Sequence, residues 1–561
     1  MSVLSVKGFA GLDRRKGISE SVATAYDMRN MRITHGGSVE KRAVTKMHCA
    51  LPANIQGIWC GSINGSEALL AAAGGILYSV DTTSGNATNV GTVGLGECLF
   101  FEFDSYVYCK TQGFYGKFDG SRLYAVDGYI PCVAISCSPN GEGTLYEEIN
   151  LLTDKRRQLF SSDGNSLSYK LAEDGISAVI SLKVDGVAYT DGFTADTAKG
   201  EVRLNTAIPA GLNNIEIVYS KSNERSRILN CRRAMLFGGN SDGRIFLYGN
   251  PDYPNYRFYS QLADGIPSAE YFPVNAFTVI GSSKINCMVQ QYDKMLIFTK
   301  NEAFYSYCEL VSDALGNLVS SFPVFSLNGS KGCLIETDGC VIDNRPITLC
   351  DDGLNIWEST SVVNEKNASC ISGPIADLIN NAAKGEQISI CDLQSTRELF
   401  FIADGTAYIY NYGIGAWYIY DSFGGKYHKT FGEKLYFANG SGIYLYTEQS
   451  ERNGNGYYKS NFITNGEAFG GSNAVLLEAD VYICGKTALT FTVEKSNGES
   501  RTRVFDFPEG TDRYMRLSFR LAQRRALPFN ITLYTEGGIC VLHSITIKTR
   551  KKERSKRFGL L

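Results

Sequence analysis

Short runs of alternating or clustered apolar residues, separated by turns that contain Gly, Asn or Asp, recur along most of the chain. Clear examples are Tyr106–Phe118 (YVYCKTQGFYGKF), Leu399–Tyr410 (LFFIADGTAYIY) and Leu435–Tyr446 (LYFANGSGIYLY). This pattern is typical of β-hairpins, because side chains alternate between the two faces of a strand and Gly or Asp permits the tight turn. Further copies lie at Leu69–Val80, Met235–Tyr248, Leu296–Tyr307 and Ile347–Ser359.

The spacing of these copies indicates a repeat. Between the copies that begin at Met235 and Leu399, successive copies begin roughly 50–60 residues apart, the length that one four-stranded blade and its loops require. The sequence therefore predicts an all-β protein built on a β-propeller, with six or seven blades both compatible. One gap, between Tyr106 and Met235, is longer, and removing a block of about 75 residues restores the period.

We expect that block to be an inserted small β-sandwich domain, and longer alternating strands near the end of the chain predict a C-terminal β-sandwich. The predicted parts are an N-terminal arm at 1–45, the β-propeller at 46–149 and 222–449, the inserted domain at 150–221, the C-terminal β-sandwich at 450–548 and a basic tail at 549–561. The arm is expected to reach a neighbouring subunit, and the inserted block to be removable. The best helix candidate is Ser372–Gly385, with Ser as N-cap and Gly at its end.

Composition supports the β prediction and excludes some functions. The chain has 58 Gly, 33 Tyr and 30 Phe but only 13 Pro, as many strands joined by tight turns require. A formal net charge of −3 argues against a polycation that coats nucleic acid. No apolar run of about 18 residues occurs, so no membrane partner is predicted. The 16 scattered cysteines are expected to be buried, reduced thiols.

Motifs that carry chemistry are missing from the sequence. No phosphate-binding Gly-rich loop, dinucleotide fingerprint, Gly-x-Ser-x-Gly or His-Glu-x-x-His is present, and there are four histidines. We therefore predict no catalytic residue, no metal site, no cofactor and no enzyme activity. Carboxylates that could suggest otherwise are expected to serve in turns, where Asp bonds the backbone. They are Asp119, Asp351, Asp352 and Asp404, and Glu147-Glu148 is a further carboxylate pair.

Two basic segments are candidate contacts to DNA or to a partner protein. Glu224–Arg233 carries four arginines against one acid, and the tail from Arg550 to Arg557 carries six basic residues against one acid. Such blocks are usually solvated, but near DNA they attract phosphates without sequence specificity. Docking on an acidic protein is equally open. The candidate residues are Arg225, Arg227, Arg232, Arg233, Arg550, Lys551, Lys552, Arg554, Lys556 and Arg557.

Several short segments between Gly8 and Asp421 resemble a family of phage proteins, the packaged-DNA stabilisation or head-completion proteins of tailed bacteriophages. These are similar in role to the tail nozzle of short-tailed phages. The resembling segments are Gly8–Leu12, Ala23–Arg42, Tyr115–Val133, Ile149–Phe160, Arg227–Asn250, Ala269–Asn275 and Tyr410–Asp421.

The resemblance implies a virion structural protein at the head–tail junction. It would assemble in the host bacterial cytoplasm as a homo-oligomeric ring, usually a hexamer, bound to portal, adaptor and tail proteins. The ring would retain packaged DNA and conduct it during ejection. Two alternatives stay open from the residues alone: a glycan-active propeller enzyme, and a monomeric propeller that binds glycan or peptide. The N-terminus has no signal-peptide pattern, which weakens both alternatives because their usual substrates are extracellular.

Overall fold

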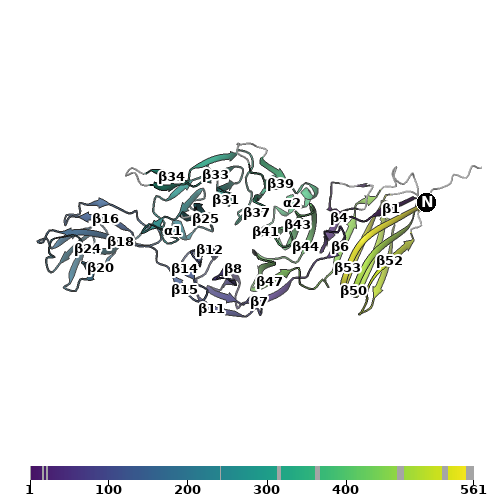
Figure 1. The fold of residues 1–561 in the computed structure, drawn as a ribbon, viewed down its shortest axis with the longest axis horizontal. Coiled ribbons are helices and arrows are strands. Elements are labelled where there is room, and N and C mark those ends of the chain that lie inside the picture. Colours follow the sequence, from purple (N-terminus) through teal and green to yellow (C-terminus); the bar gives the residue numbers. More distant parts are fainter. Residues whose placement is uncertain are drawn as a thin grey trace, which may run out of the picture. The chain divides into compact units, whose positions relative to one another are not determined.

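The structure, a computed structural model, is nearly all β-strand, as predicted. It describes residues 2–15, 18–19, 23–239, 242–312, 318–359, 367–463, 473–520 and 528–550. Two short α-helices, α1 (Ser226–Leu229) and α2 (Ala376–Ala382), occur in this part of the chain (Figure 1). The chain divides into two compact units. Unit 1 comprises Met1–Gly61, Val80–Ala87 and Gly339–Leu561, and unit 2 comprises Ser62–Ser79 and Thr88–Asp338.

The predicted helix at Ser372–Gly385 is shorter than expected. It consists of a 3-10 turn, η2 (Gly373–Ile375), followed by α2. Ser372 does not cap it, because its hydroxyl instead accepts a hydrogen bond from the backbone N–H of Leu354 at 3.0 Å. A tertiary contact has therefore replaced the local capping interaction.

The predicted hairpins form antiparallel four-stranded sheets, and unit 2 contains three that follow one another along the chain. The first has the order β12 (Leu99–Phe103), β13 (Tyr106–Lys110), β14 (Tyr115–Phe118), β15 (Leu123–Ala125). The second has the order β25 (Arg233–Gly239), β26 (Asp242–Tyr248), β27 (Tyr256–Tyr259), β30 (Phe277–Val279). The third has the order β31 (Ile285–Gln291), β32 (Lys294–Thr299), β33 (Ala303–Tyr307), β36 (Val324–Asn328).

Unit 1 repeats the same arrangement. One sheet has the order β37 (Cys340–Ile342), β38 (Arg345–Cys350), β39 (Gly353–Trp357), β40 (Ala368–Cys370). The next strands in order are β41 (Ile388–Leu393), β42 (Glu398–Ala403), β43 (Thr406–Asn411), β44 (Ala416–Asp421). The last sheet has the order β45 (Tyr427–Phe431), β46 (Lys434–Asn439), β47 (Gly442–Thr447), β7 (Lys46–Ala50), so an N-terminal strand completes it. A further sheet, most of whose residues belong to unit 2, consists of β8 (Ile55–Ile63), β9 (Ser66–Ala73), β10 (Ile76–Val80) and β11 (Ala87–Thr92).

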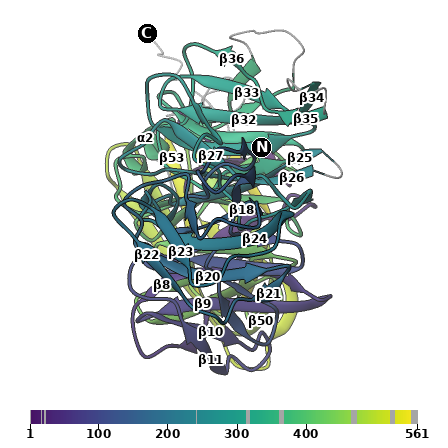
Figure 2. The same cartoon turned by 90° about the vertical axis from the view of Figure 1, so that its left-hand side faces the viewer.

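The inserted block is a small domain of two sheets with its own core (Figure 2). A six-stranded sheet has the order β17 (Thr144–Leu145), β16 (Cys132–Cys137), β18 (Lys155–Ser162), β24 (Gly211–Ser220), β20 (Ala178–Val184), β21 (Val187–Ala188). A three-stranded sheet has the order β19 (Ser168–Lys170), β23 (Glu201–Leu204), β22 (Phe193–Asp196). Buried side chains from both sheets, among them Phe160, Tyr169 and Ile217, form one cluster.

The boundary predicted for this domain, 150–221, needs correction at its N-terminal side. Strand β16 begins at Cys132 and pairs in parallel with β18, so the domain starts before residue 150. Asn150, Leu151 and Leu152, in contrast, are buried against the four-stranded sheets of unit 2, and both leucines belong to that core. The chain thus enters the inserted domain at β16, returns to the core of the four-stranded sheets at residues 150–152, and enters the inserted domain again at β18.

The strands predicted as a separate C-terminal sandwich belong to one curled sheet of sixteen strands. Its longest members are β50 (Asn473–Lys495) and β53 (Phe529–Arg550), and β51 (Ser500–Phe507) and β52 (Asp512–Arg520) each pair with β50. The opposite edge of β53 pairs with β48 (Gly456–Ser460) and with strands from the N-terminal segment. These pairings make the sheet continuous with β41–β44 rather than independent of them.

The N-terminal segment is also different from the arm predicted at 1–45. It contributes β1 (Ser2–Val6), β2 (Gly11–Leu12), β4 (Thr24–Arg29), β5 (Met31–Ile33) and β6 (Val39–Lys41) to the same sheet. Met28, Met31 and Val39 are fully buried. The segment is therefore part of the core of unit 1, and its strands are too short to give a periodic signal in the sequence.

Candidate functional site

The candidate carboxylates are turn and loop residues. Asp119 Oδ1 accepts hydrogen bonds from the backbone N–H groups of Ser121 and Arg122, each at 2.8 Å, in the turn between β14 and β15. These bonds, together with the Ser121 hydroxyl, hold the pKa of the exposed Asp119 carboxyl below its usual range. Gly120, with φ +102°, provides the left-handed backbone that this turn requires. The turn role predicted for Asp119 is confirmed.

Three of the other carboxylates accept hydrogen bonds from backbone or side-chain groups of nearby loops and turns. Asp404 lies at φ 45° between β42 and β43, and its Oδ1 accepts the Gln387 N–H at 3.2 Å. Asp352 Oδ1 accepts from the Asn355 side-chain amide at 2.6 Å beside the β38–β39 turn. Glu147 accepts the Cys132 N–H at 2.5 Å and the Tyr129 hydroxyl at 2.9 Å. Each of these carboxylates stabilises a loop or a turn.

The four candidate arginines at 225–233 surround helix α1, but they do not form one exposed cluster. Arg227 is 9% exposed, and its guanidinium lies 5.3 Å from the centroids of the Tyr253 and Phe258 rings. Arg233 pairs with Asp338 at 3.1 Å and is 18% exposed in its side chain. Contacts within unit 2 thus occupy Arg227 and Arg233.

The remaining two arginines of this segment are more accessible. Arg232 is exposed and Arg225 is half-buried. Of the tail candidates, Arg550 ends strand β53, whereas Lys551, Lys552, Arg554, Lys556 and Arg557 lie outside the described residues. The sequence could not separate the four arginines, because their burial depends on aromatic residues from β27 and β30 and from the loop before β27.

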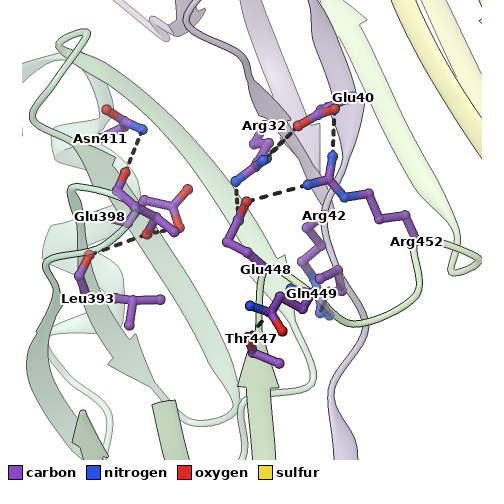
Figure 3. A network of polar contacts seen from close by, with 12 residues as sticks. Arg32, Glu40, Arg42, Leu393, Glu398, Asn411, Thr447, Glu448, Gln449 and Arg452 are labelled. Carbon is purple, nitrogen blue, oxygen red and sulfur yellow. Dashed lines mark hydrogen bonds and ion pairs between the residues drawn. The ribbon is translucent and has the colours of Figure 1, made fainter. Parts of the chain in front are cut away.

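A partly buried network of charged side chains, shown in Figure 3, is the main polar feature of unit 1 that the sequence did not reveal. Arg32 on β5 donates to Glu40 on β6 at 2.8 Å and also bonds Glu448, which follows β47. Arg452 bonds the same two carboxylates, at 2.6 Å to Glu40 and 3.4 Å to Glu448. The network joins the N-terminal segment to the end of the last four-stranded sheet.

Glu398, the first residue of β42, is fully buried near this network. Thr396 donates its hydroxyl to Glu398 Oε2 at 2.9 Å, and Tyr418 donates its hydroxyl to Oε1. Burial raises the pKa of Glu398, and the positive charge of Arg32 partly opposes that rise. Burial alone would lower the pKa of Arg32, but the surrounding phenol and carboxylate groups raise it. This arrangement places the charge of Arg32, from the N-terminal segment, close enough to Glu398 on β42 to affect its pKa.

One further carboxylate, Asp392 on β41, has an environment that differs from those of the turn residues. Burial raises the pKa of Asp392 to about 6, and the charge of Asp343 adds to this rise. One of its oxygens accepts from the Tyr412 hydroxyl at 3.5 Å, and the other is buried without a hydrogen-bond partner among the described residues. The sequence did not single out this residue, because it stands in an ordinary apolar strand.

Cysteines and other potential metal ligands do not form a metal-binding cluster in the described part of the chain. Twelve of the 16 cysteines are buried and one, Cys370, is exposed, which confirms the predicted burial for most of them. Burial raises the pKa of the Cys98, Cys231 and Cys391 thiols to about 12, so these stay protonated. Within the described residues, no group of three or more His, Cys, Asp or Glu could hold a metal ion. None of the described helices is long and apolar enough to cross a membrane.

Comparison with known proteins gives no family for this chain. No protein-family model matches it, and no curated protein matches it. Among solved structures, a chain of the mitotic checkpoint complex has 9% identity and a TM-score of 0.32, over 72% of this chain and 94% of that one. An exo-β-1,3-galactanase from Phanerochaete chrysosporium has 11% identity and a TM-score of 0.18, over 84% and 98%. PorZ from Porphyromonas gingivalis has 11% identity and a TM-score of 0.25, over 73% and 44%. TM-scores this low do not support an argument about fold or function.

Proposed function

We propose that this protein is a structural component of a tailed-phage virion at the head–tail junction, where a ring of copies retains packaged DNA and conducts it during ejection. The observation that carries the proposal is the run of resembling segments from Gly8 to Asp421. Two features of the structure are compatible with a structural role. The candidate carboxylates bond groups in turns and loops, and the charged side chains of the network in Figure 3 join distant segments of the chain. Such an architecture suits a scaffold better than an enzyme.

The finer fold that we propose is a seven-bladed β-propeller. Seven antiparallel groups of four strands succeed one another between β7 and β47, and in six of them the strands are ordered as they follow one another along the chain. The last group takes its fourth strand, β7, from the N-terminal side of the first group. Propellers commonly need such a shared blade, because it joins the two ends of the repeat by backbone hydrogen bonds.

Contact with DNA would depend on exposed basic groups and would not be sequence-specific. Arg225 and Arg232 are the members of the 225–233 segment that are accessible enough for this role, and the tail residues are further candidates. Each phosphate neutralised would release counterions, so the observed affinity should fall steeply with salt concentration. Changing Arg232 to Ala should weaken binding to any duplex equally and lower the salt slope by about one.

A glycan-active enzyme is a second proposal, and Asp392 is the observation that favours it. A carboxyl group with a pKa of about 6 has the protonation behaviour of a general acid. If Asp392 had this role, Asp392→Asn would lower hydrolysis of a β-linked oligosaccharide by about 100-fold or more. Turnover that is absent, or unchanged in Asp392→Asn, would exclude the role.

The virion proposal is tested by deleting the gene in the source genome and inducing phage production. We expect the wild-type chain in purified DNA-filled particles by mass spectrometry, and we expect particles from the deletion strain to lose DNA, measured as DNA accessible to nuclease. Complementation with the intact gene should restore retention. Wild-type particles without this chain, or deletion particles that keep their DNA, would contradict the proposal.

A further inference from the structure

Four strands of the curled sheet lie at one level, in the order β1, β53, β50, β52 (Figure 1). All three neighbouring pairs are antiparallel. From Val3 to Val6 the registers align one residue of each strand in a cross-strand row. Two of these rows are Leu4, Ile547, Leu477, Phe519 and Val6, Ile545, Ala479, Leu517.

The two outer strands of this group are edges. Among the described residues, β1 pairs with β53 only and β52 with β50 only. An edge strand presents unpaired N–H and C=O groups, and natural proteins usually block such edges with charged residues or Pro. Strand β1 has the sequence SVLSV, which contains neither, and Val3 is 59% exposed. Strand β1 is therefore an edge without the usual protection.

Strand β52 is protected along only part of its length. Arg513 occupies the same alternating register as the buried Leu517 and Phe519, yet it is exposed, and a charge at such an edge position opposes pairing. Toward the end of the strand this face is apolar, with Leu517 at 8% and Phe519 at 7% exposure, while Arg516 and Arg520 are exposed on the other face. The open part of β52 thus lies at the same level as β1.

We infer that β1 of one copy pairs with the open end of β52 of a second copy, which extends the sheet from one subunit to the next. Because four strands alternate in direction, β1 runs opposite to β52, so this pairing is antiparallel without any reversal. The apolar register of Leu4 and Val6 would continue that of Leu517 and Phe519. This inference rests on the proposed function, which requires a ring of copies, and it identifies the contact that would join neighbouring subunits.

The charges on β52 favour this contact over the alternative two-fold arrangement, in which β52 pairs with β52 of a second copy. Pairing β52 with β52 of a second copy would bring the exposed Arg516 and Arg520 of both copies onto the same face, and like charges across strands are destabilising. Pairing β52 with β1 at the level of these rows sets Val3 opposite Arg520 and Ser5 opposite Ser518. It leaves one like-charge pair, Lys7 with Arg516, and Arg516 already pairs with Asp480 at 2.7 Å. A contact between two different surfaces is heterologous, and it forms a closed ring when the rotation between copies closes.

Disulfide trapping between two variants, each with one added cysteine, tests the joint. Val3→Cys and Arg520→Cys, each in a Cys370→Ser background, are mixed under mild oxidation. We expect a linked dimer in the mixture, at least tenfold more abundant than in either variant alone. The control pair replaces Val3→Cys with Val187→Cys, at a site in the inserted domain that is 71% exposed. No excess over this control at the highest soluble concentration, or equal linking of Arg520→Cys alone, would overturn the inference.

A second pair of variants separates the joint from the proposed function. Val3→Lys should block the edge, whereas Val3→Thr keeps a neutral, β-branched side chain. We expect both variants to melt like the wild type, and Val3→Lys to be incorporated into particles at least tenfold less than Val3→Thr. Equal incorporation would overturn the joint but leave the virion role intact. Wild-type chain missing from particles would contradict the virion role itself.

Discussion

Removing the Arg32 guanidinium should destabilise unit 1 more than removing any other charge of the network in Figure 3. Arg32 is 15% exposed and neutralises Glu40, which is 11% exposed, and Glu448. Its charge also opposes the burial of Glu398. Breaking a buried ion pair by removing one partner costs ~3–5 kcal/mol, because the remaining charge is left without compensation. We expect a loss in that range for Arg32→Met.

The matched control is Arg452→Met, which removes a guanidinium bound to the same two carboxylates. Arg452 is 22% exposed, and Arg32 would still neutralise both partners, so we expect a loss of only about 1 kcal/mol. Replacing Glu398 by Gln in the Arg32→Met background should recover at least ~1 kcal/mol, because it removes a buried charge that has lost its counter-charge.

The assay is equilibrium unfolding in urea followed by tryptophan fluorescence. All three tryptophans, Trp59, Trp357 and Trp417, belong to unit 1, so the signal reports on the unit that contains the network. The penalty of Arg32→Met should also be smaller at pH 5 than at pH 8. The folded-state pKa of Glu398 is raised, so its protonated form is compatible with burial and stability falls as pH rises through that pKa.

Three results would refute this reasoning. They are a loss below ~1 kcal/mol for Arg32→Met, an equal loss for Arg452→Met, and no recovery on adding Glu398→Gln. Any of them would mean that the carboxylates are solvated or neutral in the folded protein. The network would then not be what joins the N-terminal segment to the rest of unit 1.

Other predictions concern single buried polar groups. Asp392→Asn should stabilise unit 1 at pH 8 but not at pH 4. The reason is that burial raises the pKa of Asp392 to about 6 in the folded state, so its ionised form is disfavoured there. An equal gain in stability at both pH values, in melts followed by tryptophan fluorescence, would contradict this. Asn150→Ala should lower the free energy of unfolding of unit 2 by ~2–4 kcal/mol, measured by hydrogen exchange, because it removes four hydrogen bonds to backbone groups. A loss under ~1 kcal/mol would show that these bonds contribute little to stability. The Lys41 amine donates to the carbonyls of Gly454 and Gly537, and burial lowers its pKa to about 8. Stability should therefore rise as pH increases from about 8 to 10 in the wild type but not in Lys41→Met, and parallel profiles would refute the shift.

Local sequence determined the elements of the four-stranded sheets. Leu399–Tyr410 contains two apolar runs around Asp404-Gly405, and it folds into β42 and β43 with the turn at those two residues. The same reasoning placed Asp119 in a turn and most cysteines in buried strands. These features were predictable because alternation and turn chemistry act between residues that are close along the chain.

Only the tertiary structure decided which distant strands pair and which charges are buried. Strand β1 joins β53 across more than 500 residues, and the signal that would indicate this is absent from a segment as short as SVLSV. Arg227 and Arg232 are equivalent in sequence, yet aromatic rings bury the first and leave the second exposed. Pairing partners and burial depend on surfaces that exist only after the chain has folded, and for that reason no local pattern specified them.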